Sequence, residues 1–435
     1  MITATIGKIF LEAYNEKFGT NHDAKSFFVE VYYPMFFNHQ KYMMTAGNTP
    51  LENGPKIGWP KMIIGSTPYE TLEQRKCRFD KLMEKFEIGY PTTDNAIGYA
   101  SSDVISTTSG QTSNIHYPFA IDEIYLSWIG AGLNVRAGGL LISFFEKQIL
   151  LDIFDGWKYY RKLLDNEKLL KGNQIESWNC QWLEFNYSEN DIRLLFPSIK
   201  KEPCKEKYLG CIQLSSLTWT KLLIAISKHF PNPKMNSYIF DLGQTNTTIG
   251  FIPFYLEHIR WPIQLYAKMF GVDEGKKAEK LWGTENGFRV CCQKGVIGIE
   301  AMQPEGLKKY FYSDKLPKIQ NNDEEQIIRF NTYKIWLLAM LNNQELWDKS
   351  QEFAELLLKC SSSQERGKKE IPQIVEDVLS SKGRTAFIDN LTKLIPYLPE
   401  KGTIEDMGKT VNGMPIENVL YFLTLLKFNY ELKKL

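Results

Sequence analysis

The fold class is decided most clearly by residues 324–341, which read EEQIIRFNTYKIWLLAML. Apolar residues recur there at the spacing of one helical face, namely Ile327, Ile328, Tyr333, Leu337 and Leu341. Similar runs follow at 353–360, 371–381, 385–396 and 415–432, with short polar breaks between them. Short breaks between amphipathic helices are typical of antiparallel bundles. The sequence therefore predicts an all-α helical bundle over residues 323–435.

The chain before this bundle has a mixed pattern. Helical spacing predicts two helices within 5–37, a charged helix near 69–86 and a short helix over 122–128. A glycine-rich turn is expected at 130–139, followed by a long helix over 140–165.

Strand patterns occur later in this part of the chain. Residues 211–214 and 237–240 read as short strands, and 289–292 with 296–299 as a small hairpin. The predicted class is thus α+β, with a mixed, loop-rich N-terminal domain over 1–320 and a sub-boundary near 168–210.

The charge balance restricts the classes of partner. The 435 residues include 52 basic and 51 acidic side chains, which leaves a formal charge of +1. Free-standing DNA clamps usually carry a basic excess, because neutralising phosphates supplies most of their affinity. The balance remains compatible with a subunit that meets nucleic acid on one face and protein on the others.

The lack of a targeting signal and of cysteine pairs in the sequence predicts a cytoplasmic protein. The seven cysteines form no CxxC pair, and Cys291–Cys292 are chain neighbours that cannot form an unstrained disulfide. Reduced thiols are typical of a reducing compartment. The N-terminus shows no secretory signal. The sequence contains no stretch of eighteen uncharged apolar residues, the length needed to span a membrane.

No complete catalytic or metal-binding signature occurs in the sequence. The five histidines form no HxxxH or HxH pair, and neither a GxSxG elbow nor a GxxxxGK[ST] loop is present. The glycines at 130–132 lack the third glycine of a dinucleotide loop, since Val135 stands at that position. Two carboxylate pairs, Asp241 with Glu257 and Asp152 with Asp155, are interpreted as solvated faces or helix caps. We therefore expect no catalytic residue, no metal and no cofactor.

Two uncharged polar loops are the best candidates for recognition. They are rich in amide and hydroxyl side chains, which can contact base edges, sugars and phosphates without adding net charge. A hydrogen-bonded turn that supports its own backbone is the alternative for each. The candidate residues in these loops are Thr107, Thr108, Gln111, Asn114, Gln244 and Asn246.

Positive charge beside aromatic side chains gives a second group of candidates. Phosphate tracking combined with base stacking requires this mixture. It occurs around the first long loop, where Lys41, Lys56 and Lys61 alternate with Tyr42 and Trp59. Asn48 of the same loop is a further candidate. Arg136 is added because small residues flank it before an expected helix N-terminus, where a phosphate could bind.

Several segments resemble the large subunit of type I CRISPR interference complexes (Cascade). They are residues 25–28, 33–37, 127–132 and 240–246, together with the helical C-terminal third. The resemblance implies a mixed N-terminal domain followed by a helical bundle. Some members of that family carry paired CxxC motifs, and this chain has none, so it implies no zinc site here.

The resemblance also implies a function. Such a subunit is non-catalytic, recognises a short motif in target duplex DNA and aids strand separation, while guide RNA reads the remaining sequence. Its partners would be target DNA, guide RNA and other subunits of the complex. A metal-dependent nuclease or hydrolase of a defence system, and a protein-binding scaffold, remain the alternatives.

Overall fold

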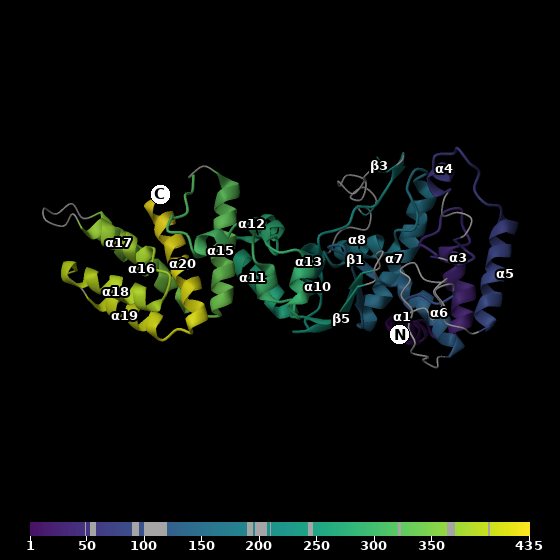
Figure 1. Ribbon diagram of the computed structural model, residues 1–435, viewed down its shortest axis with the longest axis horizontal. Helices are drawn as coiled ribbons and strands as arrows, with labels where there is room; N and C mark the ends of the chain where they lie inside the picture. The colour runs from purple at the N-terminus through teal and green to yellow at the C-terminus, as the bar shows by residue number, and fades with distance from the viewer. Residues whose placement is uncertain are drawn as a thin grey trace. The chain divides into compact units, whose positions relative to one another are not determined.

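The computed structural model describes residues 1–47, 49–52, 58–88, 95–99, 120–188, 195, 207–208, 210–241, 247–320, 323–362, 370–398 and 401–435. These residues form two units (Figure 1). The first contains Met1–Leu256 and Phe288–Ile297, and the second contains Glu257–Gly287 and Gly298–Leu435. The boundary expected at 320–323 lies within the second unit, where Lys277 pairs with Glu324.

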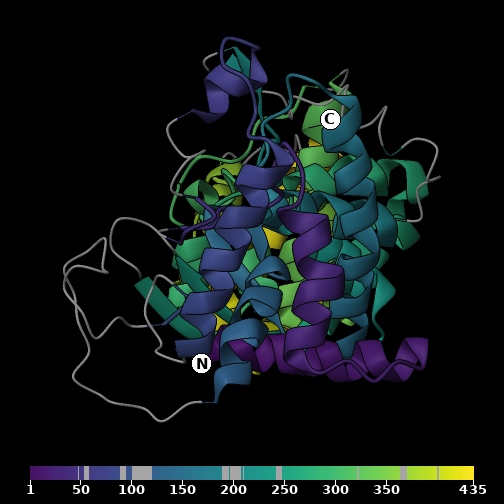
Figure 2. The same ribbon diagram turned by 90° about the vertical axis from the view of Figure 1, so that its right-hand side faces the viewer.

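The first unit is built on a close crossing of two helices, α1 (Ile2–Phe18) and α6 (Ile121–Gly132). Figure 2 shows α1, in dark purple, along most of its length. A β-carbon on Gly7 would lie 2.1 Å from the Leu126 carbonyl oxygen, and one on Gly130 would lie 1.9 Å from that of Thr3. Only glycine permits this approach, because its second α-hydrogen can point at the facing carbonyl.

Aromatic side chains fill the core beside this crossing. A second helical stretch runs through α2 (Ala24–Phe27), a π-helical turn η1 (Phe28–Tyr32) and α3 (Tyr33–Phe36), as expected for residues up to 37. The Tyr32 ring stacks on Phe36 at 4.1 Å, and its hydroxyl donates to the Trp128 carbonyl oxygen at 2.7 Å. The π turn ends two residues before Pro34, which has no N–H to continue the helical ladder.

One four-stranded antiparallel sheet follows α6, in the order β1-β2-β5-β6. Its strands are β1 (Val135–Ala137), β2 (Leu140–Phe144), β5 (Met235–Asp241) and β6 (Thr247–Phe254). Every residue of β2 is buried, so both faces of that strand are covered. The expected strand over 237–240 is confirmed, and 211–212 forms part of a separate pair, β3 (Lys207–Tyr208) with β4 (Cys211–Ile212).

The predicted helix over 140–165 is wrong in its first part. Residues 140–144 form β2, and helix α7 runs over Lys147–Asn166. Gly138 and Gly139 take φ values of 56° and 80°, the conformation of a two-residue hairpin loop joining β1 to β2. The turn expected at 130–139 is thus reduced to its last part, the loop at Gly138–Gly139, because residues 130–132 belong to α6 and residues 135–137 to β1.

The hairpin expected at 289–299 is also wrong. Residues 288–293 form helix α13 (Phe288–Gln293), and the Phe288 ring stacks on Trp219 of α10 (Trp219–His229) at 5.3 Å. Ile297 pairs instead with Phe254 of β6, through backbone bonds from Ile297 N to Pro253 O and from Tyr255 N to Ile297 O. The short apolar runs had the length of strands, but their partners lie elsewhere in the chain.

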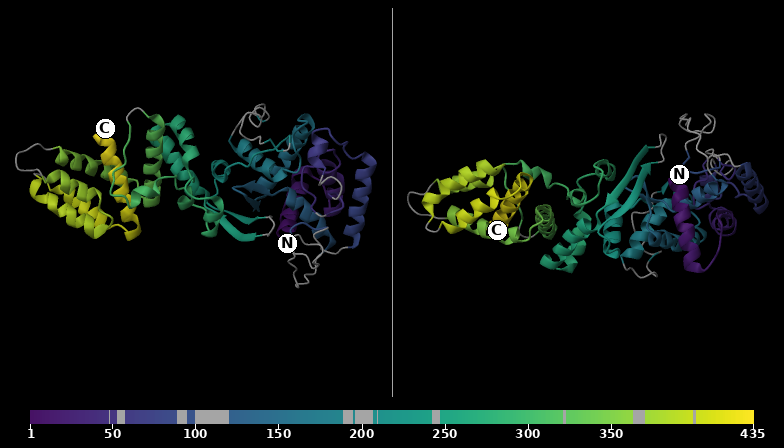
Figure 3. Two further views of the ribbon diagram at one scale, coloured as in Figure 1. Left: turned by 45° about the horizontal axis from the view of Figure 1, so that its top comes forward. Right: turned by 90° about the horizontal axis from the view of Figure 1, so that it is seen from below.

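The helical character expected for residues 323–435 is confirmed. The helices of this region are α15 (Glu324–Leu341), α16 (Glu345–Ser361), α17 (Ile371–Leu379), α18 (Arg384–Leu394), α19 (Gly402–Asn412) and α20 (Ile416–Lys434). The two views of Figure 3 show the yellow and yellow-green helices side by side. Asp323 caps α15 by accepting from the Gln326 backbone N–H.

Helix α15 is buried on nearly all sides rather than on one face. It packs against α20, and α20 packs against α16. Earlier helices of the second unit also reach α15, among them α11 (Leu256–Phe270) and α12 (Val272–Ala278). Lys334 of α15 is buried with its ammonium 4.8 Å from the Trp347 ring centre and 5.6 Å from that of Phe270. No helix in the described part of the chain is both long and apolar enough to cross a membrane.

The α1–α6 crossing makes a testable prediction. Gly130→Ala places a methyl group against the Thr3 carbonyl, so we expect it to lower the free energy of unfolding by about 1 to 3 kcal/mol or more. Gly408→Ala is the matched control, because it also lies within a helix and its nearest neighbours would be 3.9 Å away. That change should be neutral or stabilise by up to about 1 kcal/mol. Denaturant unfolding measures both, and equal stability of the two variants would contradict the role of the crossing.

Candidate functional site

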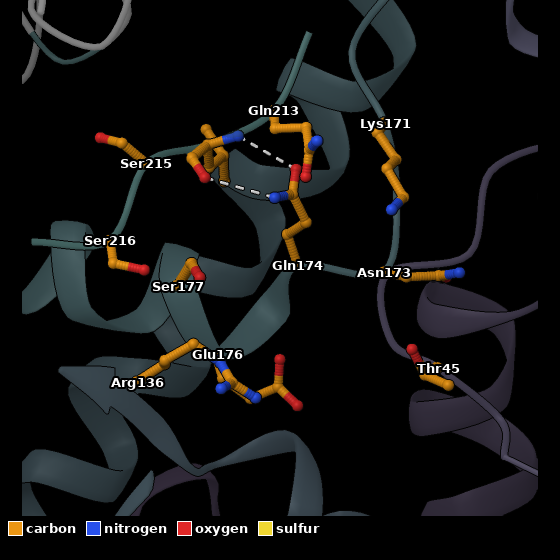
Figure 4. Close-up of a pocket in the computed structure, with 11 residues that line it drawn as sticks. Thr45, Arg136, Lys171, Asn173, Gln174, Glu176, Ser177, Gln213, Ser215 and Ser216 are labelled. Atoms are coloured by element: carbon orange, nitrogen blue, oxygen red, sulfur yellow. Dashed lines mark hydrogen bonds between the residues drawn. The ribbon is translucent and has the colours of Figure 1, made fainter. Parts of the chain in front are cut away.

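A polar cavity of about 530 Å³ lies within the first unit and is the candidate functional site (Figure 4). Two chain segments form most of its wall, one entering helix α8 (Ile175–Tyr187) and the other following β4. Strand β1 contributes Arg136, and the segment that follows α3 contributes Thr45. The lining residues are Thr45, Arg136, Lys171, Asn173, Gln174, Glu176, Ser177, Gln213, Leu214, Ser215 and Ser216.

The segment entering α8 is held by backbone contacts. Asn173 N donates to Tyr42 O at 2.9 Å, and Ile175 N donates to Met43 O at 3.1 Å. A β-carbon on Gly172 would lie only 2.3 Å from Tyr42 O, so glycine is required there. Asn173 takes a φ of 57°, a left-handed conformation that asparagine tolerates better than most residues. Backbone hydrogen bonds alone thus hold this part of the cavity wall in place.

The opposite wall is held by side-chain amides. Gln174 pairs with both backbone groups of Leu214: the Leu214 N–H donates to Gln174 Oε1 at 3.0 Å, and Gln174 Nε2 donates to Leu214 O at 3.3 Å (Figure 4). Gln181, on the next turns of α8, donates to Ser215 O at 2.8 Å. These bonds imitate the pairing of a strand and hold residues 213–216 alongside α8.

A buried polar network places β1, and with it Arg136, beside α8. Asn179 Nδ2 lies 2.8 Å from both Gly132 O and Asn134 O, the two carbonyls that lead into β1. Ser143 Oγ donates to Asn134 Oδ1 at 2.7 Å. Buried polar groups of this kind are costly unless paired, so the network favours one arrangement of these segments. Arg136 therefore reaches the cavity from a fixed strand.

The charges in the cavity are two cations and one carboxylate. Figure 4 shows Arg136 beside Glu176, with Lys171 on another side of the cavity. Burial raises the pKa of the Glu176 carboxyl, and the positive charge of Arg136 acts in the opposite direction. With Glu176 ionised the lining carries one net positive charge. Hydroxyl and amide groups supply most of the remaining polar surface.

This arrangement suits binding of a polar, anionic ligand. A guanidinium and an ammonium can hold phosphate oxygens, while amides and hydroxyls can donate to or accept from sugars and base edges. Among the described residues, no three His, Cys, Asp or Glu side chains gather closely enough to hold a metal ion. Two of the carboxylates considered in the sequence have other contacts: Asp241 pairs with Arg289, and Asp152 accepts from Tyr187 and Gln148.

Arg136 is the residue nominated from the sequence that the structure places in this cavity. The reason given for it is corrected, because Arg136 lies on β1 and is followed by the Gly138–Gly139 hairpin rather than by a helix. The chain therefore offers no helix N-terminus to a phosphate at this position.

The other described candidates lie outside the cavity lining. Lys41 is buried, and its ammonium donates to Leu164 O at 3.0 Å and Glu167 O at 2.7 Å, at the end of α7. The Trp59 ring is buried edge-to-face against Tyr42 at 5.1 Å, so neither face is open for a base to stack upon. Lys61 is exposed on α4 (Trp59–Ile63). Their assignment to nucleic-acid binding stays a prediction.

Eight nominated residues lie outside the described part of the chain. They are Asn48, Lys56, Thr107, Thr108, Gln111, Asn114, Gln244 and Asn246. Sequence reasoning did not nominate Lys171, Gln174 and Gln213. Gln213 meets the other two only through tertiary contacts between segments about forty residues apart in the chain. The available signal was Gly172–Asn173, a pair typical of a tight turn before a helix.

Comparison of the chain with models of protein families, with curated proteins and with solved structures finds no match. The site is therefore interpreted from its own chemistry.

The paired amides of Gln174 allow a direct test of how the wall is held. Gln174→Ala removes both bonds to Leu214, so we expect the Leu214 amide to exchange its hydrogen at least tenfold faster, with a loss of about 1 to 2 kcal/mol in stability. Gln213→Ala deletes a neighbouring amide and leaves both bonds in place. Hydrogen exchange resolved by residue measures both, and unchanged protection of Leu214 in Gln174→Ala would show that other contacts hold this wall.

Proposed function

We propose that the protein is a non-catalytic nucleic-acid-recognition subunit of a multi-subunit RNA-guided antiviral effector complex. In this proposal it contacts target duplex DNA at a short motif and aids strand separation, while a guide RNA reads the remaining sequence. The observation that carries nucleic-acid binding is the polar cavity, with Arg136 and Lys171 among amides and hydroxyls. The placement in an RNA-guided complex rests on the resemblance of the sequence segments to Cascade large subunits.

The cavity would act on the sugar–phosphate backbone. Arg136 and Lys171 are the lining side chains that would hold phosphate oxygens, while Gln213 and Ser216 would contact sugar hydroxyls or base edges. Backbone contacts of this type fix the register of a nucleic acid and carry little sequence information. Motif recognition would then fall to the polar segments at 101–118 and 243–246, whose amide and hydroxyl side chains suit base edges. Residues 247–250, which the sequence groups with the second segment, belong to β6 instead.

A near-neutral chain fits this division of labour. A subunit that binds beside others gains from a few well-placed cations and avoids a large field that would attract nucleic acid anywhere on its surface. The lining of the cavity follows this pattern, since it combines two cations with one half-buried carboxylate.

The proposal predicts the behaviour of charge-removing variants. Arg136→Gln and Lys171→Gln should each weaken binding of labelled duplex DNA or single-stranded RNA by about 5- to 20-fold, through loss of a charge-assisted phosphate contact. Each should also reduce the slope of log affinity against log salt by about 1. A filter-binding or anisotropy titration across salt concentrations measures both quantities.

Lys158→Gln is the matched control. It removes the same charge from an exposed position on α7, where Lys158 pairs with Asp155 at 3.5 Å. The proposal requires this variant to bind like the unmodified chain. Equal losses in all three variants would mean that net charge alone, and not the cavity, governs binding.

A further inference from the structure

A second cavity, of about 560 Å³, lies in the first unit and is distinct from the polar cavity described above. It is bounded by residues 38–41, by α4 and the turn after it, by α5 (Leu72–Ile88) and by the end of α7. Its volume is typical of a small-molecule site. The two cavities share no lining residue.

The lining of this second cavity is strongly basic. Lys41, Arg75, Arg161 and Lys168 face a single lining carboxylate, Asp165, which Arg161 already engages through Nη2 at 3.1 Å. Burial lowers the pKa of Lys41 to about 8, and the nearby positive charge of Arg161 acts in the same direction. The cavity therefore has positive charge that its own carboxylate does not neutralise.

Two guanidinium groups in this lining keep donors that the described residues do not satisfy. Arg161 is 8% exposed and donates through Nη1 to Lys41 O at 2.8 Å, but its Nε–H has no acceptor there. The Nε–H of Arg75 is likewise buried without an acceptor, although Nη1 donates to Glu70 O at 2.8 Å. Leaving donors of charged groups buried and unsatisfied is costly, and the negative charge of an anion in the cavity would offset part of that cost through the field of the two guanidinium groups.

Beside the polar residues 38–40, apolar and aromatic side chains form a wall of this cavity. Met62, Ile63 and Leu164 are buried, and the half-buried Tyr69 lies in the same lining. A small inorganic anion would leave this wall without a partner. A flat, weakly polar group attached to the anion would cover it and could stack on the tyrosine ring.

We propose that this second cavity binds a nucleoside monophosphate, either as a free nucleotide or as the 5′-phosphorylated end of a nucleic-acid chain. Arg75, Arg161 and Lys168 hold the phosphate, and Tyr69 with the apolar wall contacts the base. Lys41 acts indirectly, because its ammonium is engaged by carbonyls at the end of α7. The proposal does not depend on nucleic-acid binding at the first cavity.

Calorimetric titration of the full chain with adenosine 5′-monophosphate, adenosine and inorganic phosphate tests this site. We expect saturable binding of the nucleotide, with adenosine and phosphate each weaker by about tenfold or more, because each lacks one half of the contacts. Tyr69→Leu should weaken the nucleotide and leave phosphate binding unchanged. No saturable binding of either the nucleotide or a 5′-phosphorylated oligonucleotide overturns the proposal.

Charge reversal on α7 separates the site from general attraction of anions. Lys168→Glu should weaken the nucleotide at least tenfold, and both Lys168 and its control, Lys162, are exposed, so neither change threatens folding. Lys162 lies near the Tyr159 ring and outside the cavity lining, and Lys162→Glu should bind like the unmodified chain. Equal losses in the two variants overturn the proposal.

The source of the phosphate is resolved by competition. Displacement of the nucleotide by a 5′-phosphorylated oligonucleotide, but not by its 5′-hydroxyl counterpart, identifies a chain end as the ligand. Binding of the nucleotide without such displacement identifies a free nucleotide. Arg136→Gln and Lys171→Gln should retain nucleotide binding in either case, so failure of the first cavity's function is distinguishable from failure of this one.

Discussion

The first unit depends on the approach of two helix backbones at Gly7 and Gly130. Each glycine lies against a carbonyl of the facing helix, and a methyl group at either position would overlap that carbonyl. The constraint extends to the candidate site, because α6 leads within a few residues to β1 and Arg136. Asn179 then joins the end of α6 to α8 through Gly132 O and Asn134 O. The α1–α6 crossing, strand β1 and the cavity wall at α8 are thus connected by short chain segments and hydrogen bonds.

The two cavities of this unit differ in chemistry although both involve the chain near residues 38–45. The first is lined by amides and hydroxyls with Arg136, Lys171 and Glu176, and it suits a hydrated, extended ligand. The second combines an excess of cations with an apolar wall, which suits a compact ligand with one charged end. Lys41 illustrates why residue type alone is a poor guide to a binding site, because its ammonium donates to carbonyl groups at the end of α7.

The sequence predicted the features that depend on local pattern. The helices of the C-terminal third and the strand at 237–240 follow from spacing, and both are present. The helix over 140–165 failed because an apolar run was joined to the next helix, although Gly138–Gly139 could have indicated a hairpin. Lys171 and Gln174 could not be predicted as site residues, because their significance comes from tertiary contacts with residues 42–43 and 214. Arg136 was chosen because small residues flank it before an expected helix, but it lines the cavity from strand β1.

We propose that this chain recognises nucleic acid as one subunit of an RNA-guided complex. The most direct measurement is purification of the tagged full chain from its native cells, followed by sequencing of bound RNA and identification of co-purified proteins. We expect a small RNA of discrete length together with several partner subunits, and photo-crosslinks from that complex to the peptides that contain Arg136 and Lys171. Repeated preparations that contain the chain alone, without RNA, would contradict it.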